Sequence, residues 1–195
     1  MNKVEPIRKA EKVKAMYEYL AGKDRTLRDA TLFLFGVSSA YRISDLLNLK
    51  YENVFNTDYR FHEYVRTKES KTRKYKQFKC PENLRKKLKE YAIKNKIREG
   101  DYLFPTKKNK QLKLDRINVW RRLKKAATTV GIKNFGTHSM RKTFGYHYYT
   151  RYPNRIGELM KVFNHSSIAY TLMYIGIEQE GLDKVYAELE EIWEI

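Results

Sequence analysis

The sequence predicts an α+β domain that is mainly helical and carries a small antiparallel β-sheet. Most of the chain repeats apolar residues at intervals of three and four, the spacing that gives an amphipathic helix one buried face. Residues 51 to 80 depart from this pattern and contain short strand-like pieces instead. The 195 residues, 42% hydrophobic and 14% aromatic, are enough for one compact domain with its own core. We therefore expect a single domain over residues 1 to 195.

Two helices are expected before the strands. Residues 8 to 21 place apolar side chains on one stripe, whereas residues 26 to 37 are more apolar and are expected to form the central, buried helix. After an interruption, residues 43 to 49 resume the helical pattern as a short helix. Arg42 stands at that junction between apolar runs, where a partly buried guanidinium requires an anionic partner. That partner is either Asp45 or a phosphate.

Residues 51 to 80 are expected to supply the sheet, with strand-like pieces near 53–55, 61–67 and 75–80. The last turn, residues 66 to 74, is a run of basic residues interrupted by one acid. Such a turn is too polar to be buried by protein, so we expect it to face the ligand. A simple phosphate contact is the default interpretation of most of its lysines.

Helical patterns return after the strands, over residues 81–96, 116–130, 154–163 and 179–193. Asp115 is a plausible N-cap for the second of these, which should end at Gly131. The same helix carries a group of basic and aromatic side chains that suggests a DNA-facing side: Trp120, Arg121, Arg122, Lys124 and Lys125.

The net charge of +18 is large and unevenly placed. Residues 178 to 195 hold seven acidic residues and one lysine, so subtracting their charge of −6 leaves +24 on residues 1 to 177. A basic body with interleaved tyrosines and arginines favours nucleic acid over a membrane surface. No apolar run is long enough for a membrane helix and no signal segment opens the chain, so we expect a cytoplasmic protein. Cys80 is the single cysteine, which excludes an internal disulfide and a multi-cysteine zinc site.

The stretch from Asn134 to Gly176 concentrates groups that can do chemistry. His138 and Arg141 are three residues apart at the start of an expected helix, which places both side chains on one face. His165 lies in an apparent break between helices, with Asn164 suited to a left-handed C-terminal position and Ser166 or Ser167 to an N-cap. Tyr174 follows nine residues later, just before a glycine that should end a short helix.

Taken together, four blocks resemble the catalytic domain of the tyrosine recombinases, the phage integrase family. Arg42-Ile43-Ser44-Asp45-Leu46-Leu47 resembles the first arginine box, and Ser70-Lys71-Thr72 resembles the hairpin lysine. His138 with Arg141 resembles the H-x-x-R box, although Met140 replaces its usual leucine. His165-Ser166-Ser167 followed by Tyr174 resembles the histidine and nucleophile box, with Asn164 in place of the usual glycine. Relatives usually carry a further helical domain ahead of the catalytic one, and we expect no such core-binding domain within these residues.

The resemblance implies a site-specific recombinase or integrase that cuts and rejoins DNA through a covalent 3′-phosphotyrosine, without a metal or other cofactor. Tyr174 would be the nucleophile, and Arg42 and Arg141 would grip the phosphate. His138 would assist proton removal, Lys71 would protonate the leaving oxygen, and His165 would hydrogen-bond the phosphate. The expected partner is double-stranded DNA, bound by a dimer or tetramer in which the acidic segment 178–195 docks on a neighbouring subunit. Further DNA contacts are expected from Lys68, Arg73, Lys74, Arg121, Arg122 and Lys125.

Several alternatives stay open from the sequence. Tyr170 lies one turn before Tyr174 and competes with it as nucleophile, and Lys68 competes with Lys71 as the acid. His62 and His147 are interpreted as structural. A DNA-binding module without turnover, or a type IB topoisomerase, would share many of these features. A metal-dependent nuclease fits poorly because four scattered histidines and one cysteine give no recognisable ligand spacing.

Overall fold

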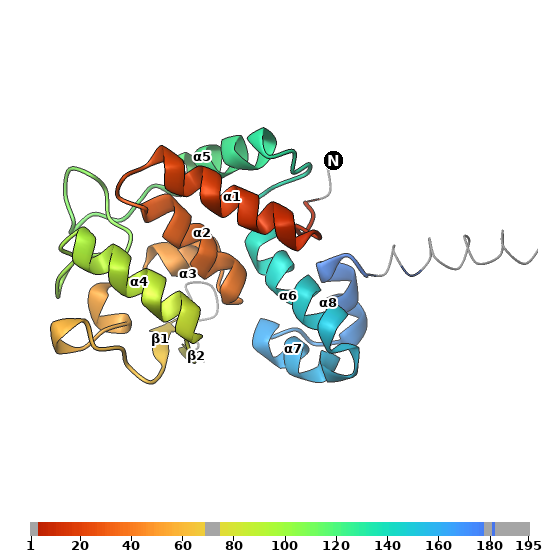
Figure 1. Ribbon diagram of the computed structural model, residues 1–195. Coiled ribbons are helices and arrows are strands. Elements are labelled where there is room, and N and C mark those ends of the chain that lie inside the picture. The colour runs from red at the N-terminus through yellow and green to blue at the C-terminus, as the bar shows by residue number, and fades with distance from the viewer. Residues whose placement is uncertain (1–3, 69–74, 178–180, 182–195) are drawn as a thin grey trace, which may run out of the picture.

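The protein folds as a mainly helical α+β domain with a small two-stranded antiparallel sheet, which confirms the predicted fold class (Figure 1). The computed structural model describes residues 4–68 and 75–177 and Gly181. Within these ranges none of the helices is both long and apolar enough to cross a membrane. The expected helix over residues 179–193 lies outside the described residues.

The helices follow the predicted ranges closely, with boundaries that shift by a few residues. They are α1 (Ala10–Lys23), α2 (Arg28–Ser38), α3 (Ile43–Leu47), α4 (Glu82–Lys94), α5 (Arg116–Thr129), α6 (Ser139–Arg151), α7 (Ile156–Phe163) and α8 (Ile168–Ile175). Short 3-10 turns occupy Tyr51–Asn53, Thr57–Tyr59 and Pro153–Arg155.

The main core is built around α2, as its apolar sequence predicts. This helix packs against α1, α4 and α6, and its middle residues Leu32, Phe33 and Phe35 are fully buried. At Gly36 a Cβ atom would lie 2.5 Å from the sulfur of Met140, so the absence of a side chain lets α6 approach α2 closely. The core therefore sets the position of α6, the helix that begins next to His138.

The sheet is smaller than the sequence predicts. Strand β1 (Val65–Lys68) pairs antiparallel with β2 (Tyr75–Phe78), and Val65 lies opposite Phe78. The expected strand near residues 53–55 is replaced by a 3-10 turn and an isolated bridge between Phe55 and Phe61. The reason is a cluster of aromatic rings, in which Phe55 lies 5.1 Å from Tyr51 and 4.6 Å from Phe61 between centroids. Ring packing of this kind outweighs the local preference for an extended chain.

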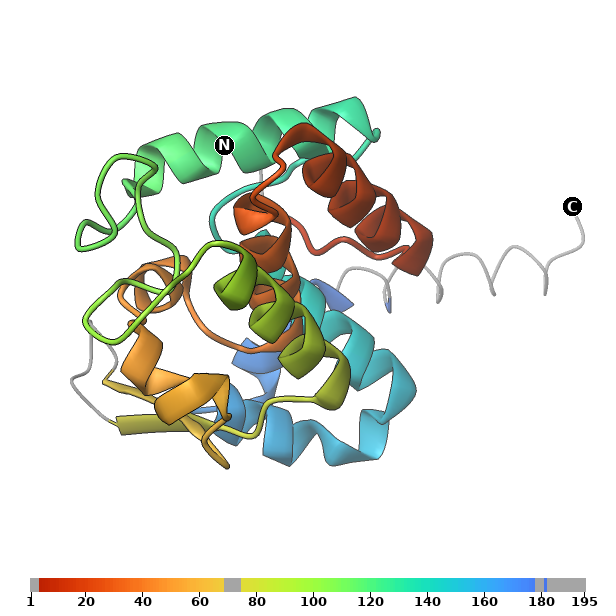
Figure 2. The same ribbon diagram turned by 60° about the vertical axis from the view of Figure 1, so that its left-hand side comes forward.

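A second, smaller core joins α6, α7 and α8, which lie side by side in both ribbon views (Figures 1 and 2). Its buried centre consists of Ala40, Leu159, Phe163 and Ile175. The N-terminal segment also contacts α6: the Ile7 amide donates to the Thr143 hydroxyl at 2.8 Å, and the His147 ring bonds the Ile7 carbonyl at 2.9 Å. His147 thus has the structural place that the sequence predicts.

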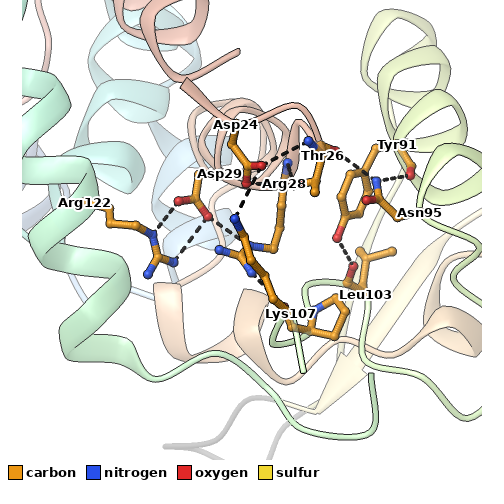
Figure 3. A network of polar contacts seen from close by, with 10 residues as sticks. Asp24, Thr26, Arg28, Asp29, Tyr91, Asn95, Leu103, Lys107 and Arg122 are labelled. Atoms are coloured by element: carbon orange, nitrogen blue, oxygen red, sulfur yellow. Dashed lines mark hydrogen bonds and ion pairs between the residues drawn. The ribbon is translucent and has the colours of Figure 1, made fainter. Parts of the chain in front are cut away.

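A buried polar network holds α5 against the start of α2 (Figure 3). The Asp29 carboxylate accepts from Arg122 Nε at 2.5 Å and from Arg28 Nε at 3.1 Å, and its side chain is almost fully buried. Arg122 was expected to contact DNA, but its guanidinium bonds this carboxylate from 93 residues away in sequence. The structure thus gives Arg122 an architectural contact, and its DNA contact stays a prediction.

Candidate active site

The first part of the site is the junction that begins α6. His138 is the N-cap residue, and Ser139 is fully buried, where its hydroxyl accepts from the Gly136 amide at 2.9 Å. This bond fixes the turn that leads into the helix. Arg141 follows one helical turn after His138, so both side chains reach the same pocket, as the spacing of three predicts.

Arg141 ties three parts of the chain together. Its side chain is buried, with 3% of the residue exposed. One terminal nitrogen donates to the Ala40 carbonyl and the other donates to the Phe163 carbonyl at 2.8 Å. The guanidinium also lies 4.7 Å from the centroid of the Phe163 ring. These contacts preorganise a charged, planar fork that would otherwise be costly to bury.

Arg42 reaches the pocket from the start of α3. Its guanidinium lies 4.0 Å from the carboxylate of Asp45, which is almost fully buried. The predicted salt bridge to Asp45 is therefore present, and 24% of the Arg42 side chain is still exposed. Because Asp45 supports the guanidinium from behind, Arg42 can face an anion on its pocket side.

The turn between α7 and α8 has the predicted local chemistry. Asn164 adopts a left-handed conformation with φ 54°, and the Ser167 hydroxyl caps α8 by accepting from the Tyr170 amide at 3.1 Å. His165 stands on this turn, and its Nδ1 lies 3.2 Å from the hydroxyl oxygen of Thr171. The turn thus directs His165 toward the pocket while α8 supports it.

Tyr174 lies at the end of α8, which terminates at Gly176 with φ 80°. Its hydroxyl is 3.3 Å from Nδ1 of His138, across 36 residues of sequence. The rings of Phe163 and His165 contact the tyrosine ring with centroids 5.4 Å and 5.0 Å away. The ammonium of Lys142 lies 5.1 Å from its centroid.

Tyr170, the competing tyrosine, is placed differently. It is 46% exposed and lies edge to face with His165, with ring centroids 4.7 Å apart. Its ring lies 6.5 Å from that of Tyr174. Of these two tyrosines, Tyr174 is the one whose hydroxyl lies within hydrogen-bond distance of His138.

These side chains line one pocket of about 420 Å³: Arg42, His138, Arg141, Asn164, His165, Ser166, Tyr170 and Tyr174. Five of the six residues predicted to be catalytic therefore lie together. The sixth, Lys71, lies outside the described residues. Larger hollows beside Trp120 and beside Tyr51 contain none of the five.

Burial and the positive charges of the pocket lower the pKa of both histidines. Burial, followed by the nearby charges of Arg141, Lys142 and Arg42, lowers the pKa of His138. Burial, with Arg141 and Arg42, lowers the pKa of His165 to about 4. At neutral pH His138 can thus accept a proton on a ring nitrogen.

The phenol of Tyr174 is protonated at neutral pH. Burial raises its pKa, while the positive charges of Arg141 and Arg42 and a hydrogen bond from Arg141 oppose this rise. The phenol therefore needs a proton acceptor to become a nucleophile.

The described residues that were predicted to contact DNA lie on α5 and at the end of β1. Arg121 and Lys125 are exposed on α5, and Lys68 ends β1. Arg73 and Lys74 lie outside the described residues. Among the described residues there is no group of three or more histidine, cysteine or acidic side chains arranged to hold a metal ion.

Two site residues went unnoticed in the sequence, Thr171 and Lys142. Thr171 is fully buried behind His165 and Lys142 lies over the Tyr174 ring. A threonine inside a helix and a lysine in a basic protein carry no distinctive sequence pattern. The Lys142 contact depends on how α6 packs on α8, and the Thr171 contact depends on the side-chain orientation of His165 on the turn before α8.

The chain has relatives among known proteins. The model of the phage integrase family matches residues 8–180. The chain belongs to this family. It is 39% identical over 186 residues to the probable integrase/recombinase YoeC of Bacillus subtilis (strain 168), covering 95% of this chain and 97% of YoeC. It is 29% identical over 175 residues to the tyrosine recombinase XerA of Pyrococcus furiosus, covering 88% of this chain and 57% of XerA.

Solved structures share the fold of the family domain. The crystal structure of XerA recombinase matches with a TM-score of 0.71 and 21% identity, covering 96% of this chain and 65% of that chain. The catalytic domain of bacteriophage HP1 integrase matches with a TM-score of 0.61 and 16% identity, covering 90% of this chain and 89% of that chain. This chain therefore spans nearly all of YoeC and of the HP1 domain, but about two thirds or less of the XerA chains.

Proposed function

We propose that the protein is a site-specific DNA recombinase that cuts and rejoins DNA through a tyrosine nucleophile. The observation that carries the proposal is the Tyr174 hydroxyl at 3.3 Å from a neutral His138, in a pocket that also contains Arg42 and Arg141. A phenol beside a base and two guanidinium groups is suited to attack on a phosphodiester.

The reaction conserves the number of phosphodiester bonds. The Tyr174 oxygen attacks the phosphorus, a P–O(tyrosine) bond forms, and the bond to the 5′ oxygen breaks. The products are a 3′-phosphotyrosine and a free 5′ hydroxyl. Attack by a 5′ hydroxyl then reverses the step and releases the tyrosine, so no external energy source is needed.

Each of the six residues predicted to be catalytic has a proposed role in that step. His138 takes the phenolic proton, because its lowered pKa keeps the ring neutral at neutral pH. Arg42 and Arg141 bind the nonbridging oxygens through planar forks and stabilise the charge of the transition state. Lys71, or Lys68 in its place, protonates the leaving 5′ oxygen. His165 hydrogen-bonds the phosphate.

We propose double-stranded DNA as the partner, bound by a dimer or tetramer. Structural relatives include XerH bound to difH, a lambda integrase dimer bound to a core site and a lambda integrase tetramer bound to a Holliday junction. In this chain the acidic segment 178–195 would dock on the basic residues 1–177 of a neighbouring subunit. Truncation after Gly176 should keep single-strand cleavage but weaken cooperative binding, and unchanged cooperativity would argue against the docking.

A suicide-substrate assay tests the proposal. The full chain is incubated with nicked duplexes drawn from the flanks of its own gene, with a chelator present, and covalent protein–DNA bands are resolved on a denaturing gel. We expect a band for the wild type and for Tyr170→Phe, and none for Tyr174→Phe. Binding without a band on sites that demonstrably bind would support a DNA-binding module without turnover. Relaxation of supercoiled DNA without recombination would instead support the topoisomerase alternative.

A further inference from the structure

A buried threonine lies directly behind His165. Thr171 has no exposed surface, and its hydroxyl oxygen makes two contacts. It lies 2.9 Å from the Ser167 carbonyl oxygen in the preceding turn of α8, and 3.2 Å from Nδ1 of His165. Neither contact is needed to form the helix itself.

The two contacts together fix where the protons are. A hydroxyl group has one hydrogen and two lone pairs, whereas a carbonyl oxygen can only accept. The 2.9 Å contact with Ser167 therefore uses the Thr171 hydrogen, a common bond for a threonine in a helix. A lone pair of Thr171 is left to face Nδ1 of His165, and that nitrogen must carry a hydrogen to bond it.

We propose that Thr171 is a positioning residue that holds neutral His165 in the Nδ1–H tautomer and turns an unprotonated Nε2 toward the pocket. The orientation follows because Nδ1 of His165 is directed at the buried hydroxyl of Thr171, while the rest of the ring lines the pocket. This inference rests on the proposed function for its catalytic meaning, but the tautomer itself can be measured without DNA.

The tautomer defines what His165 can do. An unprotonated Nε2 accepts a hydrogen bond and cannot donate one to a phosphate oxygen. It becomes a donor only after it takes a proton from solvent, which gives an imidazolium that still donates from Nδ1 to Thr171. His165 would thus bind the phosphate as a cation whose protonation is coupled to the arrival of the DNA.

The surroundings of His165 favour that coupling. Burial, together with the positive charges of Arg141 and Arg42, keeps the pKa of His165 low without DNA. The rings of Phe163, Tyr170 and Tyr174 pack around it at centroid distances of 5.2, 4.7 and 5.0 Å. A bound phosphate would offset the two guanidinium charges, so the pKa of His165 should rise when the scissile phosphate enters.

The direct test is a measurement of the tautomer of His165 in the DNA-free, 195-residue chain at neutral pH. Long-range ¹H–¹⁵N correlation spectra distinguish a ring nitrogen that carries hydrogen from one that does not, and His165→Gln assigns the signal. We expect a protonated Nδ1 and an unprotonated Nε2. A protonated Nε2, or averaged shifts from both tautomers, would overturn the inference.

Matched variants connect the tautomer to cleavage. Thr171→Val keeps the branched shape but removes the hydroxyl, so the shifts should move toward a mixture of tautomers. Single-turnover cleavage at saturating DNA should fall about tenfold, the order expected for one lost hydrogen bond, with DNA affinity unchanged. Thr171→Ser should restore both readouts. Wild-type shifts in Thr171→Val would overturn the inference, whereas an absence of cleavage in the wild type would count only against the proposed function.

Discussion

Replacing Gly145 by alanine should disturb the site without touching any of its reactive groups. Gly145 lies in α6 where that helix crosses α7 and α8. A Cβ atom there would lie 2.6 Å from Cζ of Phe163 and 2.7 Å from Cγ2 of Ile175. These distances are roughly 1 Å inside normal carbon–carbon contact, which is about 3.5–4.0 Å. Both neighbours are fully buried, so neither side chain can swing into solvent.

The magnitude follows from two opposing effects. Overpacking of a well-packed core costs about 1–3 kcal/mol, whereas alanine in place of glycine inside a helix contributes about 0.5–1 kcal/mol. The free energy of unfolding should therefore fall by up to about 2.5 kcal/mol, and each kcal/mol lost lowers Tm by roughly 2–4 °C for a chain of this length. The rate of cleavage should fall as well, because a shift of Phe163 moves two catalytic residues. Its carbonyl accepts a hydrogen bond from Arg141 and its ring packs on Tyr174.

A second glycine provides the control. At Gly157 in α7 an added Cβ would have nothing within 4 Å, so Gly157→Ala should be neutral or stabilising by up to about 1 kcal/mol. Thermal unfolding and single-turnover cleavage would be measured for both variants at a temperature where both are folded. If Gly145→Ala is as stable and as active as Gly157→Ala, the reasoning about how α6 sets the pocket is refuted.

Three further predictions concern other parts of the molecule. Asp29→Ala should lower the free energy of unfolding, measured in urea, by about 2–4 kcal/mol. This loss is smaller than that from breaking a fully buried ion pair, because Arg122 is partly exposed. A loss under about 0.5 kcal/mol, which is typical of a surface site, would contradict the prediction. The folded state lowers the pKa of His165 from 6.5 to about 4, so the unfolded chain binds more protons and stability should fall as pH falls between these values. In urea titrations across this pH range, His165→Gln should lose less stability than the wild type. An equal loss of stability in the two proteins would count against the lowered pKa of His165. Lys71→Met should lose cleavage of ordinary DNA. It should still cleave DNA with a 5′-bridging phosphorothiolate, because the sulfur leaving group needs no acid to protonate it. If Lys68→Met shows this pattern and Lys71→Met does not, Lys68 is the acid that protonates the leaving oxygen.

The sequence predicts best where one residue decides a local conformation. Asp115 caps α5 by accepting from the Asn118 amide at 2.9 Å, Asn164 is left-handed and Gly176 ends α8, as predicted. Such positions depend on a few neighbouring atoms, which are all encoded nearby. Helix boundaries could therefore be predicted to within a few residues.

Contacts between distant segments were harder to predict. Arg122 looked like a DNA contact because its sequence neighbours are basic, and its bond to Asp29 depends on how α5 packs on α2. Residues 53–55 looked like a strand, but the ring of Phe55 packs on the rings of Tyr51 and Phe61. In both cases tertiary packing decides the outcome, and local sequence patterns do not contain it.

In the candidate active site, too, the local patterns could be predicted and the contacts between distant segments could not. The family motifs identified the residues that the fold brings together, because each motif is a short local pattern. The approach of Tyr174 to His138 depends on the crossing of α6 and α8, and the support of His165 by Thr171 depends on side-chain orientation within one turn. Only the folded structure provides that geometry.

The central claim is that Tyr174 forms the covalent bond to DNA. The most direct measurement is to trap the complex on a nicked duplex, digest it with nuclease and protease, and locate the nucleotide adduct by tandem mass spectrometry. We expect a 3′-phosphonucleotide on Tyr174, in the peptide that also contains Tyr170. An adduct on Tyr170 or on any other residue would contradict the proposed mechanism.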